Sequence, residues 1–391
     1  YPASTGASNM RTWGRKLPGS IRYYPEYLMD AGYYCTNNSK TDYAFTEPKH
    51  ETLWNETSPK AHYKKRSGNQ PFFAIFNYTG THESRFFDNQ KELYVNPEEV
   101  PVPPYYADND TIRKDLAINY SNIKRLDDWI GNKLRELEET GQADSTIVFF
   151  WSDHGGPLPN QKREIYDRGT KVPLIVKFPN NLFAGERVED MISLMDLGPT
   201  VMSLAGIPTP EYMHGQAFLG EYKAEPQQYV HAARGRIAAQ YDVRRTVRDD
   251  RYRYVRNYYP ELPRYQHFNY RMRIDMMLNL LENLESRKLN EIQQTWFEKT
   301  KPVEELYDTQ TDPHEVNNLI ANPEHTEVLT RLRNAHAEQM ISIKDVGLIP
   351  EPMIFRLQDS LKMPVYSIVR KYDYPMEEIR KVAIEWTTEK P

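Results

Sequence analysis

Three polar clusters in the sequence carry side chains that could bind a metal ion or an anion. Each cluster directly follows a short apolar run that is typical of a β-strand, and the clusters cover residues 37–42, 79–83 and 152–156. In open α/β sheets, ligands bind just beyond the carboxyl ends of the strands. We therefore expect the three clusters to lie close together in the folded chain.

The third cluster has the most specific chemistry, because it reads Ser152-Asp153-His154-Gly155-Gly156. A carboxylate next to an imidazole at a strand end, with glycines opening the loop, can hold a divalent cation. Asp153 and His154 are thus candidate metal ligands. Lys40 and Lys162, on neighbouring loops, could neutralise a tetrahedral anion bound to that cation.

The same residues also have ordinary interpretations. The tripeptide Asp153-His154-Gly155 occurs by chance in capped polar loops, and Lys40 and Lys162 could each be a solvated surface lysine. His82, in the second cluster, could be a hydrogen-bonded structural histidine. Random placement would scatter such residues over helices too, so their occurrence after separate strands favours a shared site.

The elements that would position these residues alternate along the first part of the chain. Hydrophobic patterns predict strands over residues 33–36, 71–77, 146–151 and 172–176, and helices over residues 26–30, 112–137 and 197–205. The run from Thr146 to Trp151 is apolar on both faces, as expected of a central strand in a covered parallel sheet. The alternation predicts an α/β domain, with helices on both faces of a mostly parallel sheet.

From about residue 226 the pattern changes. Short strands over residues 229–233, 244–248 and 252–256 predict a small antiparallel sheet, with helices over residues 276–289 and 325–340 packed on it. The last fifty residues are weakly patterned. We predict a catalytic domain over residues 1–225, a smaller α+β subdomain over residues 226–345 and an extension over residues 346–391.

Composition limits the classes of protein that fit. The formal net charge of -5, with both signs interspersed, gives no basis for whole-surface nucleic-acid binding. No stretch approaches the roughly 18 apolar residues of a membrane span. The single cysteine, Cys35, excludes an intramolecular disulfide framework and a multi-cysteine metal site, and we expect it to be buried at the start of a strand.

Several ordered motifs resemble those of a known family. In Ser152-Asp153-His154-Gly155 followed by Lys162, the lysine lies 11 residues before Pro173. Other similar segments are Tyr1-Pro2-Ala3-Ser4-Thr5-Gly6, Tyr24-Pro25-Glu26-Tyr27-Leu28, Pro71-Phe72-Phe73 with His82, and Glu305-Leu306-Tyr307-Asp308 with Asp312-Pro313-His314-Glu315. The sequence thereby resembles the type I sulfatases of the alkaline phosphatase superfamily, and especially their N-sulfoglucosamine sulfohydrolase branch.

The resemblance implies an alkaline-phosphatase-like fold and hydrolysis of a sulfate ester or sulfamate of a glycan. In that family the nucleophile is a formylglycine made from cysteine or serine, and calcium and lysines stabilise the charge on the sulfuryl group. The resemblance assigns Asp153 and His154 to calcium, Lys40 and Lys162 to sulfate, and His82 to a general acid or substrate contact. It also implies a periplasmic, lysosomal-like or secreted protein, and leaves the oligomeric state unknown.

Two departures from the family pattern stand out. Many members carry a histidine shortly after the first lysine, where this chain has Thr41-Asp42-Tyr43. The nucleophile motif and the N-terminal strand with paired aspartates are absent from the sequence, and Cys35 lacks the Pro and Arg of the modification motif. We therefore expect the nucleophile upstream of Tyr1, and residues 1–391 alone to be inactive and to bind calcium weakly.

Two alternatives stay open at this point. A non-catalytic sulfatase-like protein could bind sulfated glycans, and a phosphodiesterase or phosphonate monoester hydrolase could belong to the same superfamily. The motifs around Tyr307 and His314 favour a sulfatase over the latter, though only by association.

Overall fold

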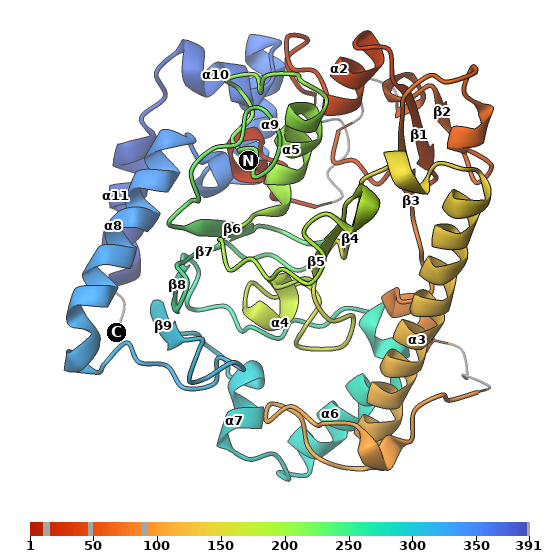
Figure 1. Ribbon diagram of the computed structural model, residues 1–391. Helices are drawn as coiled ribbons and strands as arrows, with labels where there is room; N and C mark the ends of the chain where they lie inside the picture. The colour runs from red at the N-terminus through yellow and green to blue at the C-terminus, as the bar shows by residue number, and fades with distance from the viewer. Residues whose placement is uncertain (11–15, 46–49, 88–91, 389–391) are drawn as a thin grey trace.

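The computed structural model describes residues 1–10, 16–45, 50–87 and 92–388, and Figure 1 shows their arrangement. The strands are β1 (Tyr34–Asn38), β2 (Glu56–Thr57), β3 (Phe72–Phe76), β4 (Val148–Trp151), β5 (Leu174–Lys177), β6 (Val230–Arg234), β7 (Arg244–Arg248), β8 (Tyr252–Asn257) and β9 (Glu304–Asp308). The α-helices are α1 (Pro2–Thr5), α2 (Tyr24–Asp30), α3 (Asp110–Glu139), α4 (Asp167–Thr170), α5 (Leu197–Leu204), α6 (Asp275–Glu285), α7 (Glu291–Gln294), α8 (Thr326–Ser342), α9 (Glu351–Leu361), α10 (Val365–Lys371) and α11 (Met376–Thr388).

A parallel sheet of order β2-β1-β3 holds the first two polar clusters at its carboxyl edge. Strands β1 and β3 pair in register from Tyr34 opposite Phe72 to Asn38 opposite Phe76. Helix α2 precedes β1, with Pro25 in its first turn, and Gly32 (φ 89°) reverses the chain between them. These elements confirm the predicted helix and strands, and Cys35 is fully buried as expected.

Helices cover this sheet on two sides. Leu28 of α2 and Val201 of α5 pack with Cys35 and Phe73 in one apolar cluster. On the other side Lys133 of α3 lies over the ring of Phe76, with 4.5 Å from Nζ to the ring centroid. Helix α3 begins at the cap of Asn109, whose side chain accepts a hydrogen bond from the backbone N–H of Ile112 (3.2 Å).

Strand β4 does not pair as the sequence predicts. It forms a two-stranded antiparallel sheet with β5, from Val148 opposite Lys177 to Trp151 opposite Leu174. A parallel return needs a crossover of a dozen or more residues, usually helical. Between β4 and β5 the one α-helix in the described residues is the four-residue α4, and the chain folds back in the opposite direction.

A four-stranded antiparallel sheet has the order β6-β7-β8-β9. Helix α8 packs on it through Leu329 and Leu332, which join Val247 and Tyr254 in one core cluster. The predicted packing of the other helix on this sheet is wrong, because Met276, Met277 and Leu280 of α6 pack with residues of α3. The apolar stripe of α6 specifies a buried face but not which partner buries it.

The C-terminal region forms three short helices, α9 to α11, where the sequence shows only weak patterning. Prolines at 350, 364 and 375 prevent one long helix and divide its hydrophobic pattern into short segments. The helices bury Ile354, Val365, Val369 and Met376 in a small cluster of their own. No helix among the described residues is long and apolar enough to cross a membrane. The domain limits at residues 225 and 345 stay a prediction.

Candidate active site

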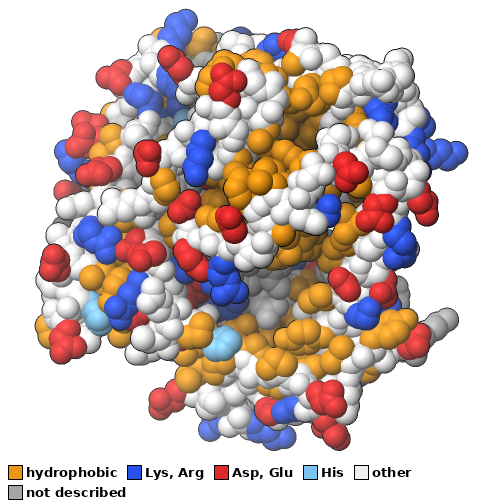
Figure 2. All heavy atoms as spheres, in the orientation of Figure 1, with side chains coloured by type: hydrophobic (Ala, Val, Ile, Leu, Met, Phe, Trp, Pro, Cys, Tyr) orange, Lys and Arg blue, Asp and Glu red, His pale blue; other side chains and the backbone are white. Residues whose placement is uncertain are grey.

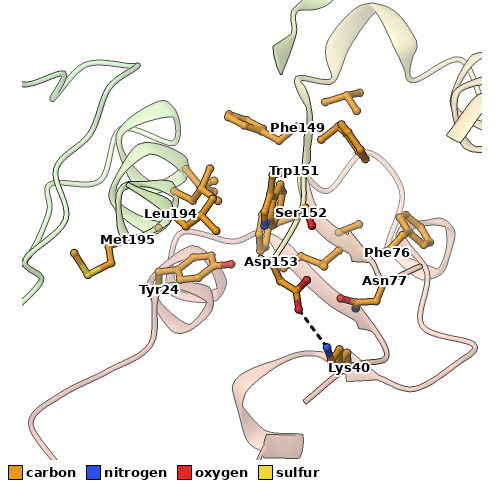
Figure 3. Close-up of a pocket in the computed structure, with 18 of the residues that line it drawn as sticks. Tyr24, Lys40, Phe76, Asn77, Phe149, Trp151, Ser152, Asp153, Leu194 and Met195 are labelled. Carbon is orange, nitrogen blue, oxygen red and sulfur yellow. Dashed lines mark hydrogen bonds and ion pairs between the residues drawn. The ribbon is translucent and has the colours of Figure 1, made fainter. Parts of the chain in front are cut away.

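A hollow of about 1900 Å³ lies between β3 and β4. Four of the five predicted site residues line its polar mouth: Lys40, His82, Asp153 and His154. Figure 3 shows Lys40, Asn77 and Asp153 converging there from the ends of different strands, and Figure 2 shows hydrophobic side chains gathered over the centre of one face of the molecule. Pockets for small ligands measure roughly 300–1,000 Å³, so the hollow exceeds what one such ligand fills.

The body of the hollow is apolar and lies between two strand edges. Side chains of β3, β4, α3 and α5 line it. Among the described residues, no strand pairs with the edge of β3 that faces away from β1, nor with a second edge of β4. Two strand edges thus border an apolar space inside the protein.

The backbone of β3 shows which groups face that space. The carbonyl of Pro71 accepts from the N–H of Tyr34 (2.8 Å), and the N–H of Asn77 donates to the carbonyl of Asn38 (2.9 Å). Backbone groups of alternate residues in a strand point to opposite edges. The peptide groups of Phe72, Ala74 and Phe76 therefore point away from β1, toward the hollow.

Asp153 and Lys40 meet at the mouth. Lys40 Nζ lies 3.4 Å from Asp153 Oδ2 and 3.9 Å from Asp42 Oδ2. Partial enclosure raises the pKa of Asp153, but the charges of His154, Lys40 and Lys162 outweigh it and hold that pKa below its ordinary value. Asp42, which the sequence left without a role, is a second carboxylate neighbour of Lys40.

Lys40 is positioned by amides at the strand ends. The side chain of Asn77 donates to the side-chain oxygen of Asn37 (2.8 Å), and Asn37 donates to the backbone carbonyl of Lys40 (2.8 Å). Asn37 is almost fully buried. This chain of hydrogen bonds links the carboxyl ends of β1 and β3, a role that the sequence alone did not reveal.

The glycines after His154 permit a close backbone approach. The N–H groups of Gly155 and Gly156 donate to the carbonyls of Gly169 and Arg168, both at 3.0 Å. A Cβ at Gly155 would collide with the carbonyl of Arg168, and a Cβ at Gly156 would collide with the side chain of Gln161. The two glycines therefore fasten the turn of the motif onto α4.

The imidazole of His154 is oriented by its own turn. Nδ1 lies 2.8 Å from the carbonyl oxygen of Gly155, which can only accept, so Nδ1 carries the proton. Nε2, 3.8 Å from Asp153 Oδ1, then carries the lone pair. Burial lowers the pKa of His154. A neutral imidazole that donates from one nitrogen to a carbonyl is the usual form of a histidine metal ligand.

These two residues fit a metal ion only as part of a larger set. Calcium takes six to eight oxygen ligands, whereas in the described part of the chain no group of three or more His, Cys, Asp or Glu side chains could hold a metal ion. Asp153 and His154 fit as two of the ligands. A calcium ion bound here would need further ligands beyond these two.

His82 lies at the start of the short 3-10 helix η3 (Glu83–Phe86) and caps it. The backbone N–H of Ser84 donates to His82 Nδ1 (3.2 Å), so in the neutral ring Nε2 carries the proton. Burial, with the charges of Lys162 and Lys40, lowers the pKa of His82 to about 4. At neutral pH His82 is therefore an uncharged hydrogen-bond donor.

Lys162 approaches the site from the loop between β4 and α4. Its Nζ lies 3.8 Å from Glu83 Oε2, and its side chain is 15% exposed. Burial lowers the pKa of Lys162, while the carboxylate of Glu83 opposes this change. Lys162 also contributes to the pKa shifts of His82 and Asp153, which places it within electrostatic reach of both.

The structure thus brings all five predicted residues to one region. It adds Glu83, the buried carboxylate that joins two loops of the site. Glu83 stands beside His82 in the second polar cluster. Its partners are about 80 residues away in the chain, so no local pattern could have revealed the contact.

Comparisons with known proteins agree on one family. The family model described as "Sulfatase" matches residues 16–207, and the model described as "N-sulphoglucosamine sulphohydrolase, C-terminal" matches residues 159–295. An ulvan-active sulfatase of Formosa agariphila is 41% identical over 90% of this chain and 66% of its own length. The human N-sulphoglucosamine sulphohydrolase is 28% identical over 62% of this chain and 51% of its own length.

A solved structure supports the fold. A putative sulfatase from Bacteroides thetaiotaomicron superposes with a TM-score of 0.62 at 18% identity, covering 88% of this chain and 80% of that structure. The expected alkaline-phosphatase-like α/β fold is thereby confirmed. The chain spans somewhat less than two thirds of the Formosa relative and about half of the human one.

Proposed function

Because the chain belongs to the sulfatase family, we propose that it serves the hydrolysis of a sulfate ester or sulfamate of a glycan. The observation that carries the proposal is the meeting of Lys40, Lys162 and His82 around Asp153 at the carboxyl ends of the strands. Two cations and an N–H donor suit the oxygens of a sulfuryl group. Ulvan and glucosamine N-sulfate are the first substrates to test, since two relatives are named for them.

The residues of this chain would act on the sulfuryl group as follows. Lys40 and Lys162 bind its oxygens and stabilise the charge that shifts as the bond from sulfur to the leaving oxygen or nitrogen breaks. His82 donates from Nε2 to an oxygen of the substrate. A calcium ion held in part by Asp153 and His154 would neutralise further negative charge. A formylglycine would supply the attacking oxygen.

We further propose that the formylglycine lies in a segment preceding Tyr1. The support is the apolar hollow between β3 and β4, whose volume suits an additional strand and whose bordering strand edges pair with no other strand of the described residues. Such a strand would pair with the outward-facing groups of Phe72, Ala74 and Phe76 and would end beside Asp153. From the family we also propose a periplasmic, lysosomal-like or secreted protein, which cell fractionation tests.

The first prediction compares residues 1–391 with a longer form that carries the proposed segment before Tyr1. The longer form should hydrolyse ulvan oligosaccharides, glucosamine N-sulfate or an aryl sulfate, and residues 1–391 alone should not, because the nucleophile and metal ligands are incomplete. Replacing the Cys or Ser of a Cys/Ser-x-Pro-x-Arg motif by Ala should abolish turnover. Sulfate release, measured by ion chromatography, checks each case.

Three outcomes would contradict parts of this proposal. Turnover by residues 1–391 alone would refute the location of the nucleophile. Binding of sulfated glycan by the longer form without turnover would favour the non-catalytic alternative. Faster hydrolysis of a phosphonate monoester than of any sulfate would favour a phosphonate monoester hydrolase.

The second prediction separates the two roles of His82. Because His82 is neutral at pH 7, we expect it to be a substrate contact, so His82→Ala should lower kcat/KM for sugar and aryl sulfates by a similar factor of about 10 to 100. A general acid would matter more for the sugar sulfate, whose leaving group needs a proton. Steady-state kinetics on both substrates measure the ratio, and a far larger loss on the sugar would contradict the expectation.

A further inference from the structure

We propose that Glu83 is a positioning residue that holds Lys162 in place and keeps it charged for binding the sulfuryl group. The inference rests on the proposed function for the role of Lys162, but its structural part stands separately. Glu83 has not been assigned a role by any motif of the sequence. Its side chain is 1% exposed, next to His82.

The contacts of Glu83 join two loops that follow different strands. Its carboxylate accepts from Arg163 Nη1 (2.9 Å) and Nη2 (2.5 Å), a two-pronged ion pair, and Oε2 lies 3.8 Å from Lys162 Nζ. Glu83 follows β3, whereas Lys162 and Arg163 follow β4. Paired bonds of this kind fix direction as well as distance. The carboxylate therefore sets the separation between the His82 loop and the Lys162 loop.

The backbone conformation at Arg163 allows both Lys162 and Arg163 to reach Glu83. Arg163 has φ 76°, in the left-handed region that residues other than glycine rarely adopt. Neighbouring side chains usually diverge, yet Lys162 and Arg163 both reach the same carboxylate. The guanidinium of Arg163 is also held over the ring of Phe268, at 4.9 Å from its centroid. Arg163 is thereby held by the carboxylate of Glu83 and by the ring of Phe268. Lys162, its neighbour in the chain, is positioned by the same contacts.

The negative charge of Glu83 also favours the protonated form of Lys162. The groups that act on Lys162 are the cations Arg163 and Lys40, the carboxylates Glu83 and Asp153, and the imidazoles of His82 and His154. Burial and the two cations favour loss of the proton from Lys162, and Glu83 is the largest influence against it. Without Glu83, Lys162 would lose its charge at a lower pH.

The test is binding of inorganic sulfate to the full chain, measured by calorimetry between pH 6 and 10. Glu83→Gln keeps the shape of the side chain and removes its charge. We expect sulfate affinity about tenfold weaker at pH 8, and an alkaline loss of binding that begins at lower pH than in the wild type. Glu83→Asp, which keeps the charge, should retain the wild-type position of the alkaline loss.

A control variant separates this effect from the loss of a two-bonded arginine–carboxylate ion pair elsewhere in the fold. Glu304 also binds an arginine by two bonds, to Arg333 Nε (2.8 Å) and Nη2 (2.5 Å), but lies on the antiparallel sheet. Glu304→Gln should change thermal stability without moving the pH dependence of sulfate binding. An equal pH shift in Glu304→Gln would overturn the proposal.

A second measurement does not depend on sulfate. Lysines are reductively methylated with ¹³C-formaldehyde, the Lys162 signal is assigned with Lys162→Arg, and its titration is followed by NMR. The signal should titrate at lower pH in Glu83→Gln than in wild type, and unchanged titration would refute the proposal. If this shift occurs but wild type binds no sulfate, the inference on Glu83 stands and the sulfate role of Lys162 fails.

Discussion

Replacing Lys162 by alanine should lower kcat/KM for sulfated substrates by about 10²- to 10³-fold in a form of the protein that hydrolyses sulfate. Removal of one preorganised donor to a developing charge has effects of this size. Lys162 is mostly buried, with 15% of its side chain exposed, so its charge acts in a medium less screening than water. The loss should fall mainly on kcat when the contact strengthens in the transition state.

The matched control is Lys124→Ala. Lys124 lies on α3, its side chain is 52% exposed, and it pairs with Asp128 at 2.7 Å. This substitution should leave kcat/KM within about twofold of wild type, because exposed ion pairs contribute little. Initial rates on an aryl sulfate and on a sulfated sugar provide the measurement. Wild-type turnover in a correctly folded Lys162→Ala protein would remove Lys162 from the proposed site.

Replacing Glu164 by alanine should destabilise the fold by about 3–5 kcal/mol, since it leaves buried arginines without their partner. Glu164 Oε2 lies 2.8 Å from Arg244 Nη1, and Oε1 lies 3.3 Å from Arg234 Nη1. All three side chains are at most 2% exposed. Glu164 comes two residues after Lys162, so the same contacts fasten the site loop to the antiparallel sheet.

Urea unfolding, followed by tryptophan fluorescence, measures the change. The fluorescence of Trp296 reports on the surroundings of Glu164, because Trp296 Nε1 donates to Glu164 Oε1 (3.3 Å). Glu285→Ala, on the exposed end of α6, serves as control and should change stability by less than about 0.5 kcal/mol. Equal unfolding midpoints for the two variants would contradict a stabilising role for the buried cluster.

The carboxylate of Glu164 also makes the stability of the fold depend on pH in the acid range. Burial alone would raise the pKa of Glu164, but Arg234 and Arg244 outweigh it and lower the pKa to about 2. The folded state thus holds its proton less tightly than the unfolded state, whose glutamate titrates near 4.3. The contribution is complete above about pH 5 and is lost as the pH falls toward 2. In Glu164→Gln this part of the acid loss should be absent.

Local patterns in the sequence determined the elements that lie closest to the site. Pro25 and Gly32 marked the limits of α2, and the run ending at Trp151 marked the strand that leads to Asp153 and His154. The five candidate site residues were predicted because polar side chains that follow apolar strands often form ligand sites in α/β folds, and because their motifs resemble those of a known family. These inferences need only neighbours in the chain, which is the range over which periodicity and turn chemistry act.

The tertiary structure decided what depends on distant partners. It paired β4 with β5 in the antiparallel direction, packed α6 against α3, and left an apolar hollow between β3 and β4. It also bound Glu83 to Arg163 and gave His82 a proton on Nε2. A carboxylate or an apolar stripe has the same local sequence whichever partner it meets. Its partner, its burial and hence its charge are set only when segments far apart in the chain come together.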